Sequence, residues 1–152
     1  MSEVFAGTRR VRFKDCDAAG IVFFPRYLAY FDACTWALFT AALGRRKREL
    51  LAHYGTVGCP MVDLRTRFLI PSTYGDEVVV ETQVRTFRRS SFEVQHRLLK
   101  DGVLAVEGVE TRVWAAADPD RPGRLKALPV PDEVIASLGG DPLQRQPVGH
   151  QP

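Results

Sequence analysis

Cysteine is scarce and long apolar runs are missing in this chain of 152 residues. Its three cysteines, Cys16, Cys34 and Cys59, are widely spaced and form no C-x-x-C pair. This spacing argues against a disulfide framework or a zinc site and favours a reducing compartment. No stretch of about 18 apolar residues could span a bilayer, and the N-terminal "MSEVFAGTRR" lacks the apolar segment of a signal peptide. We therefore expect a cytoplasmic protein without a membrane partner.

A large surplus of one charge is also missing. The chain has 21 Lys and Arg against 18 Asp and Glu, a net charge of +3, which is too small to indicate a nucleic-acid partner by itself. The sequence contains no G-x-S-x-G, H-E-x-x-H, G-x-x-x-x-G-K-[ST] or G-x-G-x-x-G motif. These absences argue against the common serine-hydrolase, zinc-protease, P-loop and dinucleotide-binding sites.

The hydrophobic pattern predicts an α+β fold. Apolar residues recur at spacings of three and four over residues 25–43, with Pro25 in the first turn and Gly44 at the end, which predicts a long helix. Alternating residues predict strands, and a shorter helix is expected between the first two of them. The expected strands cover residues 8–15, 61–71, 76–87, 91–102 and 103–116, with short last pieces at 124–129 (strand) and 131–140 (helix).

One long helix must then cover one face of an antiparallel sheet. The other face and the edges stay open unless a second copy covers them, so we expect an oligomer. We assign residues 1–138 to a single domain and expect the polar, proline-containing tail, residues 139–152, to be disordered.

Carboxylates are the best acid–base candidates. His150 lies in the tail, His96 on an apolar strand face and His53 near the end of the short helix, so none is a good catalytic candidate. Cys34 and Cys59 have no histidine partner in view and are predicted to be small buried side chains.

The stretch "DCDAAGIVFFPRYLAYFDA" resembles the signature of the 4-hydroxybenzoyl-CoA thioesterase family of hotdog-fold enzymes. The resemblance continues in "GTVGCPMVDLRTRF", "YGDEVVVETQVRTFRRSSFEVQHRL" and "ETRVWA", over roughly residues 8–130. It implies a curved antiparallel sheet of about five strands around a central helix, and an acyl-CoA thioesterase without a metal or redox cofactor. Coenzyme A would enter only as part of the substrate. The family also implies a tetramer of hotdog dimers with the active site at a subunit interface.

The resemblance assigns the catalytic carboxylate to Asp17. It would attack the thioester carbonyl or activate a water as general base. The backbone N–H groups of Phe23 and Phe24, at the start of the long helix, would polarise the thioester oxygen. The alternative is that Asp17 only caps a turn, and Asp15 is expected to be a structural turn acid.

The resemblance assigns Asp32 to the far end of an aromatic acyl group, where it would accept a hydrogen bond from a ring hydroxyl. Tyr27, Cys59 and Pro60 are the other expected substrate-binding residues. An exposed helix acid or an ion pair between subunits is the alternative for Asp32, and core packing explains Tyr27 nearly as well.

The cluster "RTFRRSSFE" resembles the family's site for the phosphates of coenzyme A, and assigns this role to Arg88, Arg89, Ser90 and Ser91. Ser90 stands where the closest pattern has lysine. A solvated basic turn is the alternative.

The leading hypothesis is hydrolysis of an aryl-CoA thioester, 4-hydroxybenzoyl-CoA or a close relative. The segment "AGIVFFPRY" lacks the histidine of aliphatic relatives and supports the aryl branch. A short- or medium-chain acyl-CoA thioesterase, a non-catalytic acyl-CoA-binding module and a nucleic-acid-binding protein are the alternatives that remain open.

Overall fold

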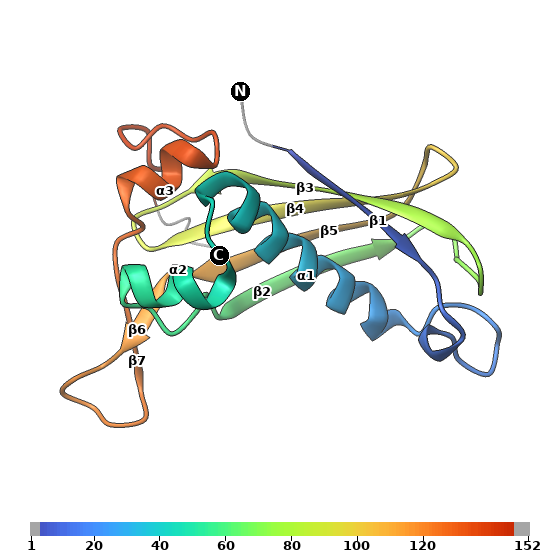
Figure 1. The fold of residues 1–152 in the computed structure, drawn as a ribbon, viewed down its shortest axis with the longest axis horizontal. Helices are drawn as coiled ribbons and strands as arrows, with labels where there is room; N and C mark the ends of the chain where they lie inside the picture. Colours follow the sequence, from blue (N-terminus) through green and yellow to red (C-terminus); the bar gives the residue numbers. More distant parts are fainter. Residues whose placement is uncertain (1–3, 148–152) are drawn as a thin grey trace.

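The structure is a computed structural model that describes residues 4–147 of the chain. Within that range, a five-stranded antiparallel sheet carries one long helix, α1 (Phe24–Leu43), across one face (Figure 1). The other elements are β1 (Phe5–Arg10), a 3-10 turn (Phe13–Asp15), α2 (Lys47–Tyr54), β2 (Met61–Phe68), β3 (Glu77–Phe87), β4 (Ser91–Lys100), β5 (Val103–Val113), β6 (Ala115–Ala117), β7 (Leu125–Ala127) and α3 (Asp132–Ser137). The predicted α+β arrangement is confirmed. None of the described helices combines the length and the apolar character needed to cross a bilayer.

Helix α1 forms where the sequence pattern places it. Pro25 lies in its first turn, where the missing N–H removes no helical hydrogen bond. Gly44 ends it in the left-handed conformation, at a φ of 68°, and donates its N–H to the carbonyl of Thr40. The buried face of the helix consists of Tyr27, Phe31, Cys34, Thr35, Leu38 and Phe39.

The sheet has the order β1-β3-β4-β5-β2, so β1 and β2 are its edges. The hairpin from β4 to β5 turns at Asp101 and Gly102, both with positive φ (51° and 75°), which confirms the predicted Asp-Gly turn. Strands β6 and β7 form a separate small ribbon.

The prediction for the first strand is wrong beyond Arg10. Val11 is fully buried, but Phe13, expected on the same face, is 80% exposed. The Asp15 carboxylate accepts the N–H of Arg12 at 2.8 Å and folds residues 13–15 into a 3-10 turn. This turn breaks the two-residue period that the alternation predicts.

Alternation places Val62, Leu64, Thr66 and Phe68 on one face of β2, and the structure leaves both ends of this face uncovered. Val62 is 63% exposed, and Phe68 is also exposed. Because β2 pairs only with β5 among the described strands, one side of it is a free sheet edge. This edge is open to pairing with a second copy.

Two hydrophobic clusters lie between α1 and the sheet. The cluster at the N-terminal half of the helix contains Phe31 and Val78, and the other contains Phe39, Phe92 and two residues of α3, Val134 and Ile135. Phe31 lies directly over Gly108 of β5, where a Cβ atom would come within 3.0 Å of its ring. Glycine at 108 therefore makes room for the helix.

The tail assigned to residues 139–152 is described as far as residue 147. Arg145 donates to the carbonyl oxygens of Arg89 and Val130, and pairs with Asp132 at 2.7 Å. The N–H of Gln146 bonds to the carbonyl of Phe87. These contacts attach this part of the tail to the β3–β4 hairpin, while residues 148–152, with His150, lie outside the described residues.

Candidate active site

Asp17 lies at the tip of a short loop between the 3-10 turn and α1. The loop is closed by the N–H of Asp17 bonding to the carbonyl of Ile21, and by Gly20, whose φ of 80° suits the tight turn. The carboxylate is exposed, and its Oδ1 accepts the N–H of Ala19 at 2.8 Å. Its Oδ2 has no partner within residues 4–147. The acid thus caps its own turn while one carboxylate oxygen stays available.

Asp15 stabilises this loop, in agreement with its predicted role as a structural turn acid. Its buried carboxylate accepts hydrogen bonds from the Arg12 N–H and the Tyr30 hydroxyl, both at 2.8 Å, and Arg26 lies 3.9 Å away. Burial acts to raise the pKa of Asp15, but these hydrogen bonds and the nearby arginine outweigh it and hold the pKa below its ordinary value. Asp15 is therefore a structural acid.

Phe24 carries the backbone N–H at the start of α1 that has no hydrogen-bond partner within residues 4–147. Phe23 donates its N–H to the carbonyl of Asp15 at 2.8 Å, so the prediction that this amide polarises a substrate needs correction. Phe24 begins the helix, where an N–H has no intrahelical acceptor, and it has no other partner in the described part of the chain. It is the available donor at the positive end of the helix dipole.

An apolar cavity of about 350 Å³ adjoins this helix start. Tyr27 forms part of its wall, and its hydroxyl accepts the N–H of Ser72 at 3.3 Å, so this side chain is fixed and largely buried. The cavity is lined by Ile21, Val22, Phe24, Tyr27, Phe68, Leu69, Ile70 and Pro71. It could take a ring or an acyl chain.

Asp32 opens onto a different cavity of about 260 Å³, further along α1. Two other predicted substrate-binding residues, Cys59 and Pro60, line the same cavity together with Trp36 and Arg112. Burial raises the pKa of the Cys59 thiol to about 12, so it is neutral. The structure therefore brings three of the four predicted residues together and separates Tyr27 from them.

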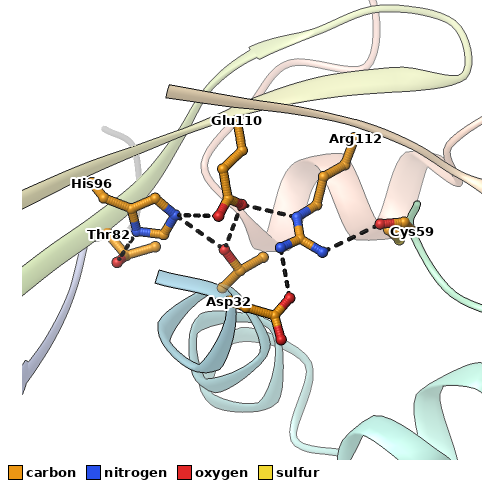
Figure 2. A network of polar contacts seen from close by, with 7 residues as sticks. Asp32, Cys59, Thr82, His96, Glu110 and Arg112 are labelled. Atoms are coloured by element: carbon orange, nitrogen blue, oxygen red, sulfur yellow. Dashed lines mark hydrogen bonds and ion pairs between the residues drawn. The ribbon is translucent and has the colours of Figure 1, made fainter. Parts of the chain in front are cut away.

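Asp32 forms an ion pair with Arg112, a partner that was not predicted from the sequence. The Arg112 Nη2 donates to Asp32 Oδ1 at 2.7 Å, and Arg112 also reaches Glu110 and the carbonyl of Cys59 (Figure 2). One feature of the sequence could have indicated this buried arginine. Glu110 and Arg112 are two residues apart on the buried face of β5, where alternation places both charges inward.

The arginine hairpin, residues 88–91, connects β3 to β4 at the opposite end of the sheet from the segment that joins β1 to α1, which carries Asp17 (Figure 1). Ile21 bridges to Thr73 just before β3, whereas Arg88 follows the last residue of that strand. Strand β3 has 11 residues, and a strand of that length covers about 35 Å.

Within the hairpin, Arg88 is mostly covered and pairs with Glu93 at 3.4 Å. Ser90 and Ser91 use backbone carbonyls to bond Trp114 and Arg88. Arg89 is exposed and forms no ion pair with any residue in 4–147. It is the most available cation of the predicted phosphate site.

Known proteins resemble this chain in sequence and in fold. A family model described as the thioesterase-like superfamily matches residues 11–138. The chain is 33% identical over 132 residues to the 4-hydroxybenzoyl-CoA thioesterase of Pseudomonas sp. (strain CBS-3), covering 84% of this chain and 92% of that protein. It is 30% identical over 139 residues, 88% of each chain, to the 1,4-dihydroxy-2-naphthoyl-CoA hydrolase of Thermosynechococcus vestitus.

Among solved structures, a variant of 4-hydroxybenzoyl-CoA thioesterase complexed with 4-hydroxybenzoyl-CoA superposes with a TM-score of 0.82 at 30% identity. The match covers 90% of this chain and 99% of that one. The predicted hotdog fold is confirmed by this likeness.

Proposed function

The chain belongs to the thioesterase-like superfamily and is an acyl-CoA thioesterase, and we propose that it hydrolyses an aryl-CoA thioester, 4-hydroxybenzoyl-CoA or a close relative. One observation carries the proposal. A carboxylate with a free oxygen, Asp17, lies on the loop that leads into α1, whose first N–H, that of Phe24, is unpaired among the described residues. Thioester cleavage needs a base or nucleophile, which the carboxylate can provide, and a hydrogen-bond donor to the carbonyl oxygen, which the N–H can provide.

The reaction can be written with these two groups and water. The Phe24 N–H binds the thioester oxygen and stabilises the negative charge that develops on it. Either Asp17 attacks the carbonyl carbon, expelling the coenzyme A thiolate and leaving a mixed anhydride that water hydrolyses, or Asp17 takes a proton from a water that attacks directly. Both routes give the free acid and coenzyme A, and we propose that no metal or redox cofactor takes part.

Asp32 is proposed to recognise the ring. Its Oδ2 has no partner in residues 4–147 and could accept a hydrogen bond from a ring hydroxyl, with Cys59, Pro60 and Trp36 as the cavity wall. Relatives named for hydroxylated benzoyl and naphthoyl thioesters support this choice over an aliphatic chain.

We infer that the complete site forms where copies of the chain meet. The loop that carries Asp17 contributes Ile21 and Val22 to one cavity, whereas Asp32 lines another. The arginine hairpin lies about 35 Å along β3 from the Asp17 loop, farther than an extended pantetheine arm reaches. Arg89, with Arg88, Ser90 and Ser91, would therefore bind the phosphates of a coenzyme A whose thioester lies at Asp17 of another copy. The exposed edge strand β2 supports a dimer, and a tetramer stays a prediction from the family resemblance.

We propose a cytoplasmic location, because Cys16, Cys34 and Cys59 are all free thiols in the structure.

A panel of aryl- and alkyl-CoA thioesters, assayed for release of free thiol, tests the substrate class. The proposal expects kcat/KM for 4-hydroxybenzoyl-CoA to exceed that for benzoyl-CoA, and both to exceed that for butyryl-CoA and octanoyl-CoA. Higher values for the alkyl thioesters would favour the aliphatic thioesterase. Binding of all thioesters without turnover would favour the non-catalytic module.

A further inference from the structure

A chain of polar side chains connects the core of the sheet to Asp32 (Figure 2), which lines the cavity of about 260 Å³. It runs from His96 on β4 through Glu110 and Arg112 on β5 to Asp32 on α1. The first three of these side chains are at most 5% exposed, whereas that of Asp32 is 52% exposed. The chain thus has a rigid buried end and an open end at the candidate substrate cavity.

Arg112 is held by acceptors on all three of its nitrogens. Its Nε donates to Glu110 Oε2 at 2.9 Å, its Nη1 to the Cys59 carbonyl at 3.2 Å, and its Nη2 to Asp32 Oδ1 at 2.7 Å. Because a guanidinium is planar, these bonds fix its orientation and therefore the direction of the Asp32 carboxylate.

Glu110 is anchored in turn from its other side. Its Oε1 lies 3.3 Å from His96 Nε2, and the hydroxyl of Thr35 donates to its Oε2 at 3.1 Å. His96 stacks on Phe31 at a centroid distance of 4.6 Å, and its Nδ1 lies 2.8 Å from Thr82 Oγ1. Burial acts to raise the pKa of Glu110, but the bonds from His96 and Arg112 outweigh it, so the carboxylate stays ionised.

We propose that Arg112 is a positioning residue that determines specificity for a hydroxylated ring, by holding the Asp32 carboxylate at the cavity wall with Oδ2 turned to the substrate. This inference rests on the proposed function, and it identifies Arg112 as the group that makes Asp32 selective for a hydroxylated ring over an unsubstituted one. An unrestrained aspartate on an exposed helix position would turn into water, and ordering it during binding would cost conformational entropy. A free carboxylate would also lose solvation without compensation when an aromatic ring covers it. Arg112 removes both costs.

The test compares kcat/KM for 4-hydroxybenzoyl-CoA with kcat/KM for benzoyl-CoA, expressed as a ratio. In Arg112→Met the ratio is expected to fall about tenfold or more, toward the ratio of Asp32→Ala, since one charge-assisted hydrogen bond is worth about that factor. The value for benzoyl-CoA should change only a few-fold. If Arg112 had only a structural role, its replacement would lower kcat/KM for both substrates by the same factor and leave the ratio unchanged.

A double variant and a surface control sharpen the comparison. Asp32→Ala/Arg112→Met should show the same ratio as Asp32→Ala alone, because Arg112 acts through Asp32. Arg97→Met removes an exposed arginine whose partner is Glu81 at 3.7 Å, and its ratio should equal that of the wild type.

Removing Arg112 leaves Glu110 buried without its cation, so Arg112→Met could fail to fold. Arg112→Lys keeps the charge but cannot reach three acceptors in one plane, and is expected to lower the ratio as well. A wild-type ratio in either folded variant overturns the inference while leaving thioesterase activity established. A wild-type protein that cleaves no aryl-CoA thioester contradicts the proposed function itself.

Discussion

The carbonyl of Asp15 accepts the N–H of Phe23 across 2.8 Å, which joins the loop that carries Asp17 to the start of α1. This bond uses one helix amide and leaves the next, that of Phe24, as the donor beside the loop. The proposed catalytic carboxylate of Asp17 and the Phe24 N–H proposed to polarise the thioester oxygen therefore belong to one small structural unit, which Asp15 holds together.

Replacement of Asp15 should destabilise the fold. Asp15→Ala removes the acceptor for Arg12 and Tyr30, and we expect a loss of about 1.5–3 kcal/mol in the free energy of unfolding at pH 7. Urea unfolding measures this, with the exposed Asp120→Ala as a control that should match the wild type.

The stabilisation by Asp15 should depend on pH in one direction. Its pKa in the folded protein lies below the ordinary 3.8, so its contribution is complete above about pH 4 and is lost as the pH falls through the lower, folded-state value. The stability difference between wild type and Asp15→Ala should narrow below pH 4. A difference that widens in acid would contradict the structural role.

Gly108→Ala should disturb the contact between α1 and β5. The new methyl group would stand about 3.0 Å from the Phe31 ring, and such overpacking costs roughly 1–3 kcal/mol. Thermal or urea unfolding measures the loss. Phe31→Leu is the matched second variant, because it changes the ring that the new methyl group would meet. The double variant should lose less free energy of unfolding than the sum of the losses in the two single variants. Losses that are strictly additive would show that the strain does not arise between these two residues.

A site shared between copies predicts recovery of activity on mixing. Asp17→Asn should lower kcat by about a hundredfold or more, and Arg89→Glu should raise KM about tenfold or more through loss of a phosphate contact. In mixed dimers formed by co-expression, one of the two sites in each hybrid is intact, so about a quarter of wild-type sites return. Activity no higher than that of the parent variants would place both residues in one chain's site.

The long elements could be predicted from the sequence because their signals are local. The spacing of Phe31, Thr35 and Leu38 predicts the buried face of α1, and Asp101 with Gly102 predicts a hairpin. Asp17 is predicted only through the family signature, since an exposed turn acid has no periodicity of its own, and its catalytic role stays a prediction.

Other features depend on contacts distant in the sequence and could not be predicted in this way. Strand β1 ends where the Asp15 side chain accepts the N–H of Arg12. The Phe23 N–H is occupied by a backbone hydrogen bond across the loop, to the carbonyl of Asp15. Arg112 meets Asp32 only because β5 and α1 lie together in the fold, 80 positions apart in the sequence. The open face of β2 depends on whether a second copy covers it.

The central claim is that Asp17 performs the chemistry, and Asp17→Asn tests it most directly. Asparagine can keep the turn bond to the Ala19 N–H but cannot act as base or anionic nucleophile. The matched control is Asp118→Asn, because Asp118 accepts the N–H of Asp120 in the same geometry at 2.9 Å, far from the candidate site in sequence.

The measurement pairs steady-state thiol release with calorimetric binding of 4-hydroxybenzoyl-CoA. We predict that Asp17→Asn lowers kcat by about a hundredfold or more while the Kd stays within a few-fold of the wild-type KM, and that Asp118→Asn leaves kcat unchanged. Wild-type turnover in a folded Asp17→Asn protein would contradict the account.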